Sequence, residues 1–522
     1  MRAHGTWGAI DPVSVGAGSP SWSGDPPLNV LLGPDTKLPA DQRPPSLAGP
    51  NSAADACRVL SAVRREGLYE RREGDGLPRW RVSPEPYWLA PADVEALERL
   101  GPILLAFYRS LNRLYYLSVK TPKLAWVHRY LDQGKPESVI EYGRMRRVRE
   151  QVPGILRPDL FVTEIGLIAS ELDSVPGGFG LTAAFQAIYG DLGHPLVGGP
   201  DGVVRAFADM VGPGSRVAIV VSDESADYRA EMAWFARALT VHGTPADAVA
   251  PGEVTFTEEG LTVGPAASPR RVDVLYRFFE LFDLKNVPKS ELFLYAAKKG
   301  AVRMTPPAKA FLEEKSAMAL WHHPALEAWW RDDLGAEVAD TLSRLFPKTW
   351  ILDPSEVPPH AVIPGFTLGG RPVRDWRDLA AASQRERRLV IKPSGFSERA
   401  WGSRGVVVGH DRSSEAWSAA VDEALRAFPT TPHVLQEFHT ARRDDVAYYD
   451  EGTDAIRPMS GRTRLSPYYF VSGDDVVLGG VLATVCALDK KLIHGMADAV
   501  LAPCAVRAAP GRAATDGQGA NA

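Results

Sequence analysis

Cysteine is scarce in this sequence. The three cysteines, Cys57, Cys486 and Cys504, lie far apart, and no CxxC pair occurs. Disulfide frameworks and structural zinc sites both need paired or closely spaced cysteines. We therefore expect neither, and we interpret Cys486, which lies in an apolar run, as a core residue.

Long apolar runs are missing as well. No stretch reaches the ~18 consecutive apolar residues that a membrane-spanning helix needs. The N-terminal segment "MRAHGTWGAIDPVSVGAGSPSWSGDPP" has no continuous apolar core, so we expect no signal peptide. These absences predict no membrane association and a cytoplasmic protein.

The chain also lacks a charge excess of one sign. Lys and Arg number 59 against 64 Asp and Glu, for a net charge of −5. Proteins that bind nucleic acid usually carry a basic excess, so nucleic acid is not an expected partner. Hydrophobic residues make up 45% of the 522 residues. Because single cores stop growing near ~250–300 residues, this length predicts several packed domains.

Several catalytic motifs are absent. There is no GxxxxGK[ST] phosphate loop, no GxGxxG opening a helix and no GxSxG nucleophile elbow. The stretch "VIK" is similar to the lysine strand of protein kinases, but neither HRD-x-x-x-x-N nor DFG follows it. A kinase is therefore disfavoured, and no covalent protein nucleophile is indicated.

Composition and periodicity divide the chain. Pro, Gly and Ser dominate the N-terminal segment. Apolar residues at helical spacing predict a helix over 92–118. The aromatic residues of this helix fit either a core or a dimer face. Oligomeric state, including a homodimer, stays open. The expected divisions are a flexible segment 1–50, a helical region 51–200, a small α/β lobe 201–288, an α+β domain 289–505 and a disordered tail 506–522.

The small lobe is expected to hold a parallel sheet, because strand patterns alternate with a helix. A buried strand within 215–221 precedes an amphipathic helix that ends at Gly243, and "VDVLYRFFEL" gives another strand. Between them, "VTFTEEGLTV" predicts a hairpin.

The stretch "LVIKPSGFSERAWGSRGVVVG" predicts a buried strand ending at Lys392, a loop over 394–405 and a second short strand. A lysine at a strand end can act as a point charge on a phosphate, and glycine-rich loops let backbone N–H groups approach phosphate oxygens. The alternative is a solvated hairpin. About 40 residues later, "HVLQEF" predicts a strand whose end offers backbone groups to a base edge, or is simply a strand end.

Two carboxylates occur at strand spacing in "ELDSVPGG". Glu171 and Asp173 lie two residues apart and so face the same side of a strand. Mg²⁺ is held by one or two carboxylates together with substrate phosphates. A polar strand edge is the alternative interpretation. Arg157 and Arg277, each at a predicted strand edge, suit either a substrate carboxylate or a structural ion pair.

Taken in order, these segments resemble the ATP-grasp fold, and specifically the circularly permuted branch that includes glutathione synthetase and glutathionylspermidine synthase. The lysine strand with its loop and the "LQEF" strand are similar to the nucleotide-binding part. No E-x-N pair follows "LQEF", whereas "RPDLFVTEIGLIASELDSVPGG" resembles the early metal-binding segment of the permuted branch. The resemblance covers about residues 145–505.

The resemblance implies an α+β fold that clamps ATP between two subdomains, with a small parallel α/β lobe and a helical N-terminal region. It implies ATP and Mg²⁺ as cofactors. The implied nucleotide-binding residues are Lys315, Lys392, Ser394, Gly395, Gly402, Gly405, Gln436, Glu437 and Phe438. The implied metal ligands are Glu171, Asp173 and Glu398, substrate would bind Arg157 and Arg277, and transferring charge would be stabilised by Arg277, Arg462 and Arg464, or by Lys490 and Lys491.

The sequence departs from the family at three places. Asp173 stands where the family has Asn, Glu398 lies six residues after Lys392, and residues 439–464 are longer and more basic than expected. The resulting hypothesis is an ATP-dependent carboxylate–amine ligase acting on a small acid and amine, such as an amino acid, peptide or polyamine. The alternative is a non-catalytic nucleotide-binding regulatory or scaffold protein.

Overall fold

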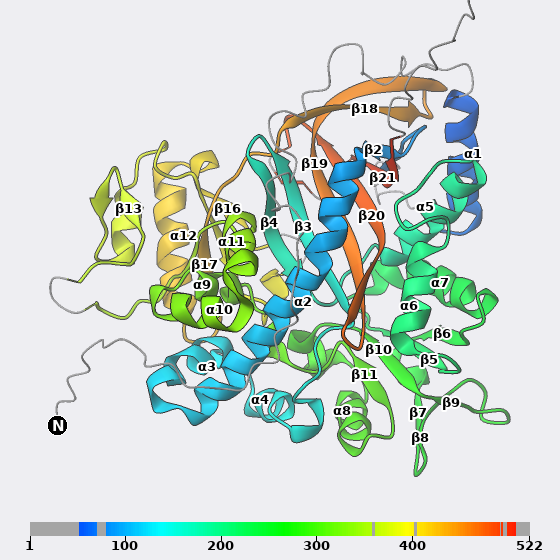
Figure 1. Cartoon of the computed structure of the whole chain (residues 1–522), viewed down its shortest axis with the longest axis horizontal. Coiled ribbons are helices and arrows are strands. Elements are labelled where there is room, and N and C mark those ends of the chain that lie inside the picture. The colour runs from blue at the N-terminus through cyan, green and yellow to red at the C-terminus, as the bar shows by residue number, and fades with distance from the viewer. Residues whose placement is uncertain are drawn as a thin grey trace, which may run out of the picture.

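A computed structural model describes residues 52–69, 80–357, 361–400, 404–490, 492–493 and 498–507. The segment 1–50, Gly402 and Lys491 lie outside these residues, as does the tail beyond residue 507. The first residue of the predicted tail, Val506, is still the last residue of a strand. The described chain folds into three neighbouring parts, seen in Figure 1 around a central twisted sheet.

The central sheet has the order β1-β21-β20-β19-β3-β4, with β2 paired to β21 and β18 paired to β19. Its inner strands are drawn from both sides of the small lobe in sequence. The bounds are β1 Trp80–Val82, β2 Tyr87–Leu89, β3 Ile155–Thr163, β4 Gly166–Asp173, β18 Arg443–Asp450, β19 Ala455–Ser472, β20 Asp475–Ala487 and β21 Ala499–Val506.

Strand β19 explains how this sheet serves both a core and a polar site. Because strand side chains alternate between faces, residues two apart share a face. Arg464 and Tyr468 therefore lie on one face of β19, and Leu465 and Tyr469 on the other. Leu465 and Tyr469 pack into the core beneath the long helix α2 (Pro91–Lys120). The opposite face is polar near Arg464 and becomes apolar at Tyr468, under helices α5 and α6.

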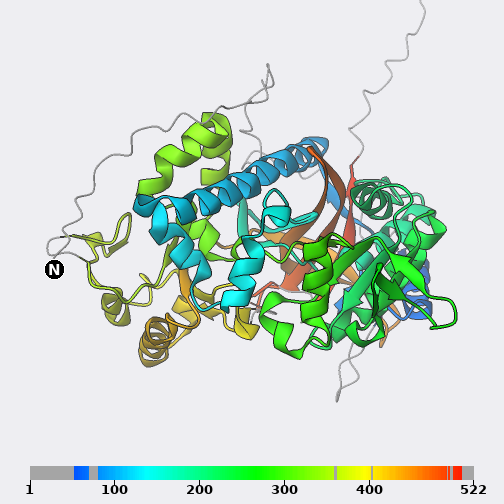
Figure 2. The same cartoon turned by 90° about the horizontal axis from the view of Figure 1, so that it is seen from below.

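Helices cover both faces of the central sheet. Helix α2 crosses one face and contacts β20, whereas α5 and α6 cover the other (Figures 1 and 2). The bounds of the helices in this part are α1 Ser52–Arg65, α3 Ala125–Asp132, α4 Glu137–Gly143, α5 Phe179–Asp191 and α6 Gly202–Val211. The predicted helix over 92–118 is α2, and its aromatic residues are mostly core.

The small lobe contains the expected parallel sheet, with the order β11-β10-β5-β6. The predicted hairpin is β7 and β8, extended by β9. The bounds are β5 Val217–Val221, α7 Arg229–Val241, β6 Ala246–Val249, β7 Thr255–Thr257, β8 Gly260–Val263, β9 Arg270–Val272, β10 Val274–Phe278, α8 Ser290–Lys299 and β11 Arg303–Thr305.

The third part is an antiparallel sheet with the order β12-β17-β15-β16, backed by α12. Its strands β15 and β17 carry the "LVIKP" and "HVLQE" segments. The bounds are α9 Ser316–Trp321, α10 Glu327–Leu334, α11 Ala336–Leu345, β12 Thr349–Ile351, β13 Thr367–Leu368, β14 Arg371–Pro372, β15 Leu389–Pro393, β16 Val407–Val408, α12 Ser414–Ala427 and β17 His433–Glu437.

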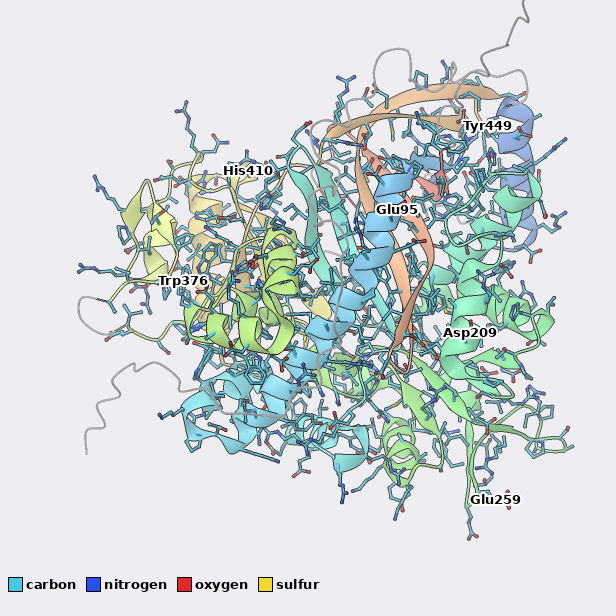
Figure 3. All side chains as sticks on the ribbon, viewed as in Figure 1. Glu95, Asp209, Glu259, Trp376, His410 and Tyr449 are labelled. Carbon is cyan, nitrogen blue, oxygen red and sulfur yellow. The ribbon has the colours of Figure 1, made fainter. Side chains whose placement is uncertain are left out.

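Two segments singled out from the sequence have clear places in the fold. Lys315 lies at the N-cap of the short helix α9. Residues 439–464, with five arginines and five acidic residues, form most of the β18–β19 arm, and Figure 3 shows Tyr449 of this arm far from Glu259 at the tip of the β7–β8 hairpin. Among the described residues, no helix has both the length and the apolar composition to cross a membrane.

Candidate functional site

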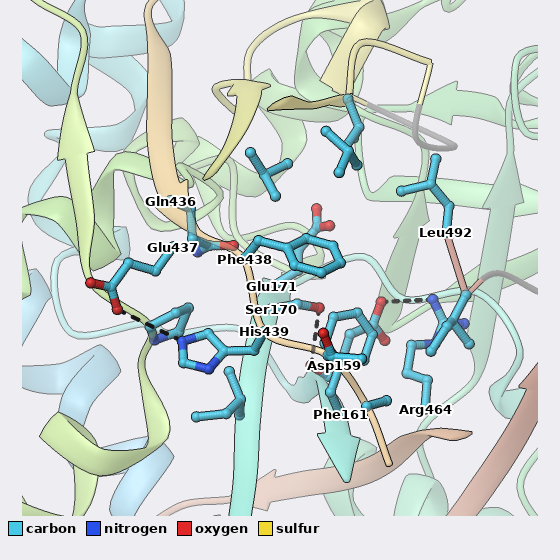
Figure 4. Close-up of a pocket in the computed structure, with 18 of the residues that line it drawn as sticks. Asp159, Phe161, Ser170, Glu171, Gln436, Glu437, Phe438, His439, Arg464 and Leu492 are labelled. Carbon is cyan, nitrogen blue, oxygen red and sulfur yellow. Dashed lines mark hydrogen bonds and ion pairs between the residues drawn. The ribbon is translucent and has the colours of Figure 1, made fainter. Parts of the chain in front are cut away.

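A cavity of about 230 Å³ lies where the central sheet meets the antiparallel sheet. Strands β3, β4 and β19 supply one wall, and β15, β16 and β17 supply the other (Figure 4). Predicted site residues from four separated segments line it, namely Glu171, Lys392, Gln436, Glu437, Phe438, Arg462 and Arg464. The lining combines charged and polar side chains with aromatic and branched aliphatic ones.

Lys392 joins the two sheets. Its ammonium donates to the Ser170 carbonyl of β4 at 2.8 Å and to Gln436 Oε1 of β17 at 2.8 Å. Neither partner carries a charge, and the side chain is only 8% exposed. Burial therefore lowers the pKa of Lys392 to about 8. A buried ammonium held only by neutral acceptors is well placed to attract an anionic ligand.

Lys315 approaches the same residues from the opposite side. Its Nζ forms an ion pair with Glu171 Oε1 at 2.7 Å and also donates to the Ala400 carbonyl at 3.2 Å. Burial opposes the charge on Lys315, but Glu171 outweighs it, so the pKa of Lys315 lies above its ordinary value. Ser170 accepts a hydrogen bond from Lys392, and Glu171 pairs with Lys315. The two lysines therefore contact adjacent residues of β4.

The β3–β4 register brings Arg157, Asp159, Glu171 and Asp173 together. Arg157 lies opposite Asp173, and Asp159 lies opposite Glu171. Arg157 pairs with Asp173 at 2.6 Å and with Asp159 at 3.4 Å. Burial raises the pKa of Asp173. For Asp159 the charges of Arg157 and Arg464 overcome burial, and its pKa is lowered.

Arg464 and Arg462 extend this charged surface onto β19. Arg464 Nη1 pairs with Asp159 Oδ2 at 2.9 Å, and Ser466 donates to the other Asp159 oxygen at 3.1 Å. Arg462 donates to the Leu488 carbonyl at 2.8 Å. Both arginines line the cavity together with Lys392 and Glu171. The lining does not include Lys315, Arg157 or Asp173.

Three apolar residues of the lining, from β15, β16 and the segment after β17, are termed the apolar slot. These are Val390, Val408 and Phe438, and Figure 4 shows the Phe438 ring between Gln436 and Glu171 in the view. The backbone N–H groups at this strand end already form hydrogen bonds. Glu437 donates to the Lys348 carbonyl at 2.9 Å, and Phe438 donates to the Arg388 carbonyl at 3.0 Å. Burial raises the pKa of the Glu437 carboxyl.

Arg277 is not brought into this cavity. The fully buried guanidinium donates to the Phe279 carbonyl at 2.5 Å and to the Pro306 carbonyl at 3.4 Å, and it pairs with Glu313. Its partner Glu313 follows the small lobe in the chain and lies two residues before Lys315. The sequence pattern predicts that Arg277 lies in a strand, but it does not predict which groups accept its hydrogen bonds.

The loop after β15 is held at its base. Gly395 lies very close to the segment that precedes Lys315. A Cβ at this position would lie 2.0 Å from the Glu313 carbonyl oxygen. Ser394 Oγ donates to Glu314, and the Gly395 N–H donates to Glu314 Oε2 at 3.2 Å. A Cβ on Gly405 would meet Pro393 at 2.6 Å. Glu398 lies on the exposed side of this loop, and no ion pair joins it to another described residue.

The carboxylates are compatible with a magnesium ion that a substrate helps to bind. No group of three or more metal-ligating side chains occurs among the described residues. Glu171 and Asp173 instead form a pair beside Lys315 and Arg157. Because Mg²⁺ keeps several water and phosphate ligands, two carboxylates suffice for the protein's share. Their present cationic partners would have to yield to the ion.

Sequence reasoning missed residues that hold the site together. Lys135 and Glu314 form an ion pair that is almost completely buried, and Glu314 in turn anchors Ser394 and Gly395. His410 and His439 line the cavity. Only the adjacency of Glu314 to Lys315 was visible in the sequence, since Lys135 and the two histidines lie in unremarkable local contexts.

The described structure is similar to a glutathione synthetase-like effector from Globodera pallida. The match covers 89% of this chain and 99% of the other, with a TM-score of 0.51 and 10% sequence identity. The two proteins share an overall fold. At this identity the likeness shows the fold alone. A "putative gamma-glutamylcysteine synthetase" from Methylobacillus flagellatus covers 70% of this chain and 83% of its own at a TM-score of 0.37 and 11% identity, which is too low for a structural argument.

Comparisons of sequence give no closer guide. No protein-family profile matches the chain. No curated protein matches it either. The mixed α/β fold and the residues that line the cavity are therefore the main guides to function.

Proposed function

We propose that this protein is an ATP-dependent carboxylate–amine ligase of the ATP-grasp type. The observation that carries the proposal is the contact of Lys392 with Ser170 and of Lys315 with the adjacent Glu171. Lys392 and Glu171 are more than two hundred residues apart in the sequence. Two ammonium groups flanking a carboxylate beside an apolar slot are the groups that a Mg²⁺-bound nucleoside triphosphate requires.

Each part of the cavity has a role in this proposal. The slot formed by Val390, Val408 and Phe438 would take the base. Lys392, which lines the cavity, would hold the phosphates together with Lys315, which pairs with the lining residue Glu171. Glu171 and Asp173 would hold Mg²⁺, which would neutralise phosphate charge when bound. Arg462 and Arg464 would face the transferring phosphoryl group. Arg157, paired with two carboxylates, would exchange one partner for the substrate acid.

The reaction needs no covalent attachment to the protein. A carboxylate oxygen of the acid attacks the γ-phosphorus of ATP, and ADP leaves with the electrons of the broken bond. The amine nitrogen then attacks the acyl carbon, phosphate leaves and one proton is released from nitrogen. The protein contributes positioning and charge stabilisation. Exclusion of water matters because an acyl phosphate hydrolyses readily.

The proposal is tested by measuring phosphate release from ATP and Mg²⁺ with panels of acids and amines. Release should depend on both an acid and an amine, and mass spectrometry should find a product equal to their sum minus water. Glu171→Gln should raise the Mg²⁺ concentration needed for half-maximal rate. The exposed Glu258→Gln, on the β7–β8 turn, is the matched control and should not.

Two results would contradict the proposal. If the protein binds ATP but releases no phosphate with any acid and amine pair, the non-catalytic nucleotide-binding alternative is favoured. If Glu171→Gln leaves the Mg²⁺ dependence unchanged in an active enzyme, Glu171 has no part in the metal site.

A further inference from the structure

Two histidines line the cavity, and neither has a role in the chemistry above. His410 follows β16, and its ring lies 4.5 Å from that of Phe438 in an edge-to-face contact. His439 follows Phe438 directly. Both imidazoles therefore border the cavity near Phe438, His410 from the turn after β16 and His439 from the segment after β17.

Each histidine carries a buried ring nitrogen without a hydrogen-bond partner. These atoms are Nδ1 of His410 and Nε2 of His439. Buried polar atoms are nearly always hydrogen-bonded, and an unsatisfied one costs free energy. Because both residues line a cavity, a bound molecule can supply the missing partners.

Backbone N–H groups at a strand end could also bind a base edge, but two of them are occupied in this structure. The N–H groups of Glu437 and Phe438 already donate to the carbonyls of Lys348 and Arg388. The strand therefore has no free amide donor at these two positions. A hydrogen-bond donor to a base edge at these two positions therefore has to come from a side chain.

The surroundings of the two rings indicate which nitrogen donates. Nε2 of His410 lies 3.5 Å from Asp411 Oδ1, which favours a proton on Nε2 and leaves Nδ1 as an acceptor. Nε2 of His439 lies 3.8 Å from Glu437 Oε2, as the dashed line in Figure 4 shows, which favours a proton on this nitrogen. Burial lowers the pKa of His439, so its ring is neutral near pH 7.

We propose that His410 and His439 select the base of the nucleotide, favouring adenine over guanine. This inference rests on the proposed nucleotide-dependent function. Adenine presents an amino donor at position 6 beside the acceptor N7, whereas guanine presents two acceptors. His410 Nδ1 accepts from the amino group, and His439 Nε2–H donates to N7. Guanine would place its carbonyl oxygen against the His410 acceptor.

The test measures affinity rather than turnover. Isothermal titration calorimetry with Mg²⁺ compares the ATP analogue AMP-PNP with the GTP analogue GMP-PNP. Wild-type protein should prefer AMP-PNP. His410→Phe and His439→Phe should each lower the AMP-PNP to GMP-PNP affinity ratio by about three- to tenfold, the range expected for one hydrogen bond. His242→Phe, at an exposed position just after α7, should leave the ratio unchanged.

A second pair of variants guards against misfolding. His410→Gln keeps a side-chain acceptor and His439→Gln keeps an N–H donor, so both should retain more of the adenine preference than the Phe variants. A purely structural role would not produce this difference in base preference.

The outcomes separate this inference from the function it rests on. Wild-type binding of AMP-PNP with a ratio unaltered in all histidine variants, or a wild-type preference for GMP-PNP, overturns the inference alone. Binding of neither analogue by the folded wild-type protein overturns the nucleotide-dependent function, and the inference falls with it.

Discussion

At the scale of single residues, Lys392 best illustrates how position creates chemistry. The sequence predicted a lysine at the end of a buried strand, and the structure has it there in β15. Its two acceptors, the Ser170 carbonyl and Gln436 Oε1, could not be predicted, because they come from two other strands. Burial, together with the nearby positive charge of Lys315, lowers the pKa of Lys392 to about 8.

This pKa predicts how nucleotide affinity depends on pH. The ammonium form binds phosphate, so affinity for Mg²⁺ and AMP-PNP should be constant below about pH 8 and fall as pH rises beyond it. Bound phosphate stabilises the ammonium and shifts the fall to higher pH in the complex. Calorimetric titrations between pH 6.5 and 9.5 measure the effect.

Lys392→Met is the comparison variant for this prediction. It should bind the nucleotide weakly at every pH and lose the part of the pH dependence that Lys392 causes, because it has no ammonium to titrate. Wild-type affinity that stays level from pH 7 to 9.5, or a variant as tight as wild type, would show that Lys392 does not bind phosphate.

Other single residues show where sequence reasoning ends. Glu171 and Asp173 were expected on one face of a strand, and the β3–β4 register has them there. Arg277 was expected beside the substrate; it does not line the cavity, and its guanidinium is bonded to Phe279, Pro306 and Glu313. A pattern of strand residues gives the period of a side chain, but not the tertiary neighbours that decide whether it is available.

At the scale of elements, local patterns predicted the small lobe well. Its parallel sheet and the β7–β8 hairpin follow from buried strand runs and from a turn-forming Glu-Glu-Gly sequence. Lys315 lies at the N-cap of α9, whose first residue is Ser316. The loop after β15 packs directly on the segment before α9, as the close approach of Gly395 to the Glu313 carbonyl shows. This tertiary contact could not be predicted from local patterns.

Helices α5 and α7 are joined by a buried carboxylate that predicts how stability depends on pH. Glu231 of α7 accepts from the Gly180 N–H of α5 at 2.9 Å and is 8% exposed. Burial raises the pKa of Glu231 to about 7. The folded protein therefore binds a proton that the unfolded chain has lost between about pH 4.5 and 7, so this group's contribution to stability falls as pH rises through that window.

Glu231→Gln should remove this contribution. The variant should gain stability relative to wild type as pH rises from about 4.5 to 7, by on the order of 3 kcal/mol at ~1.4 kcal/mol per pKa unit. Urea unfolding at several pH values measures the difference. Glu258→Gln, at an exposed turn, is the matched control. A wild-type to Glu231→Gln difference that does not vary with pH would contradict the assignment.

At the scale of the whole molecule, the site exists only because distant segments share one sheet. Strands β3 and β4 precede the small lobe in sequence, and β19 follows it, yet β19 pairs with β3. The order of motifs suggested that an early acidic segment serves a late lysine strand. The pairing of strands, the covering of the sheet by α2 and the buried Lys135–Glu314 ion pair needed the three-dimensional structure.

The cavity combines charged and apolar surfaces, and two sheets form it. The central sheet contributes Glu171, Arg462 and Arg464, and the antiparallel sheet contributes Lys392 and the apolar slot. The groups proposed to bind the base, the phosphates and the metal therefore come from both sheets. The central claim is therefore that one nucleotide bridges the two sheets.

A crystal structure with AMP-PNP and Mg²⁺ tests this claim most directly. The account predicts the base in the slot beside Phe438, the phosphates within ~4 Å of both Lys315 Nζ and Lys392 Nζ, and Mg²⁺ at ~2.1 Å from a Glu171 or Asp173 oxygen. A nucleotide bound elsewhere, or bound here with Glu171 and Asp173 more than ~10 Å from its phosphates, would contradict it.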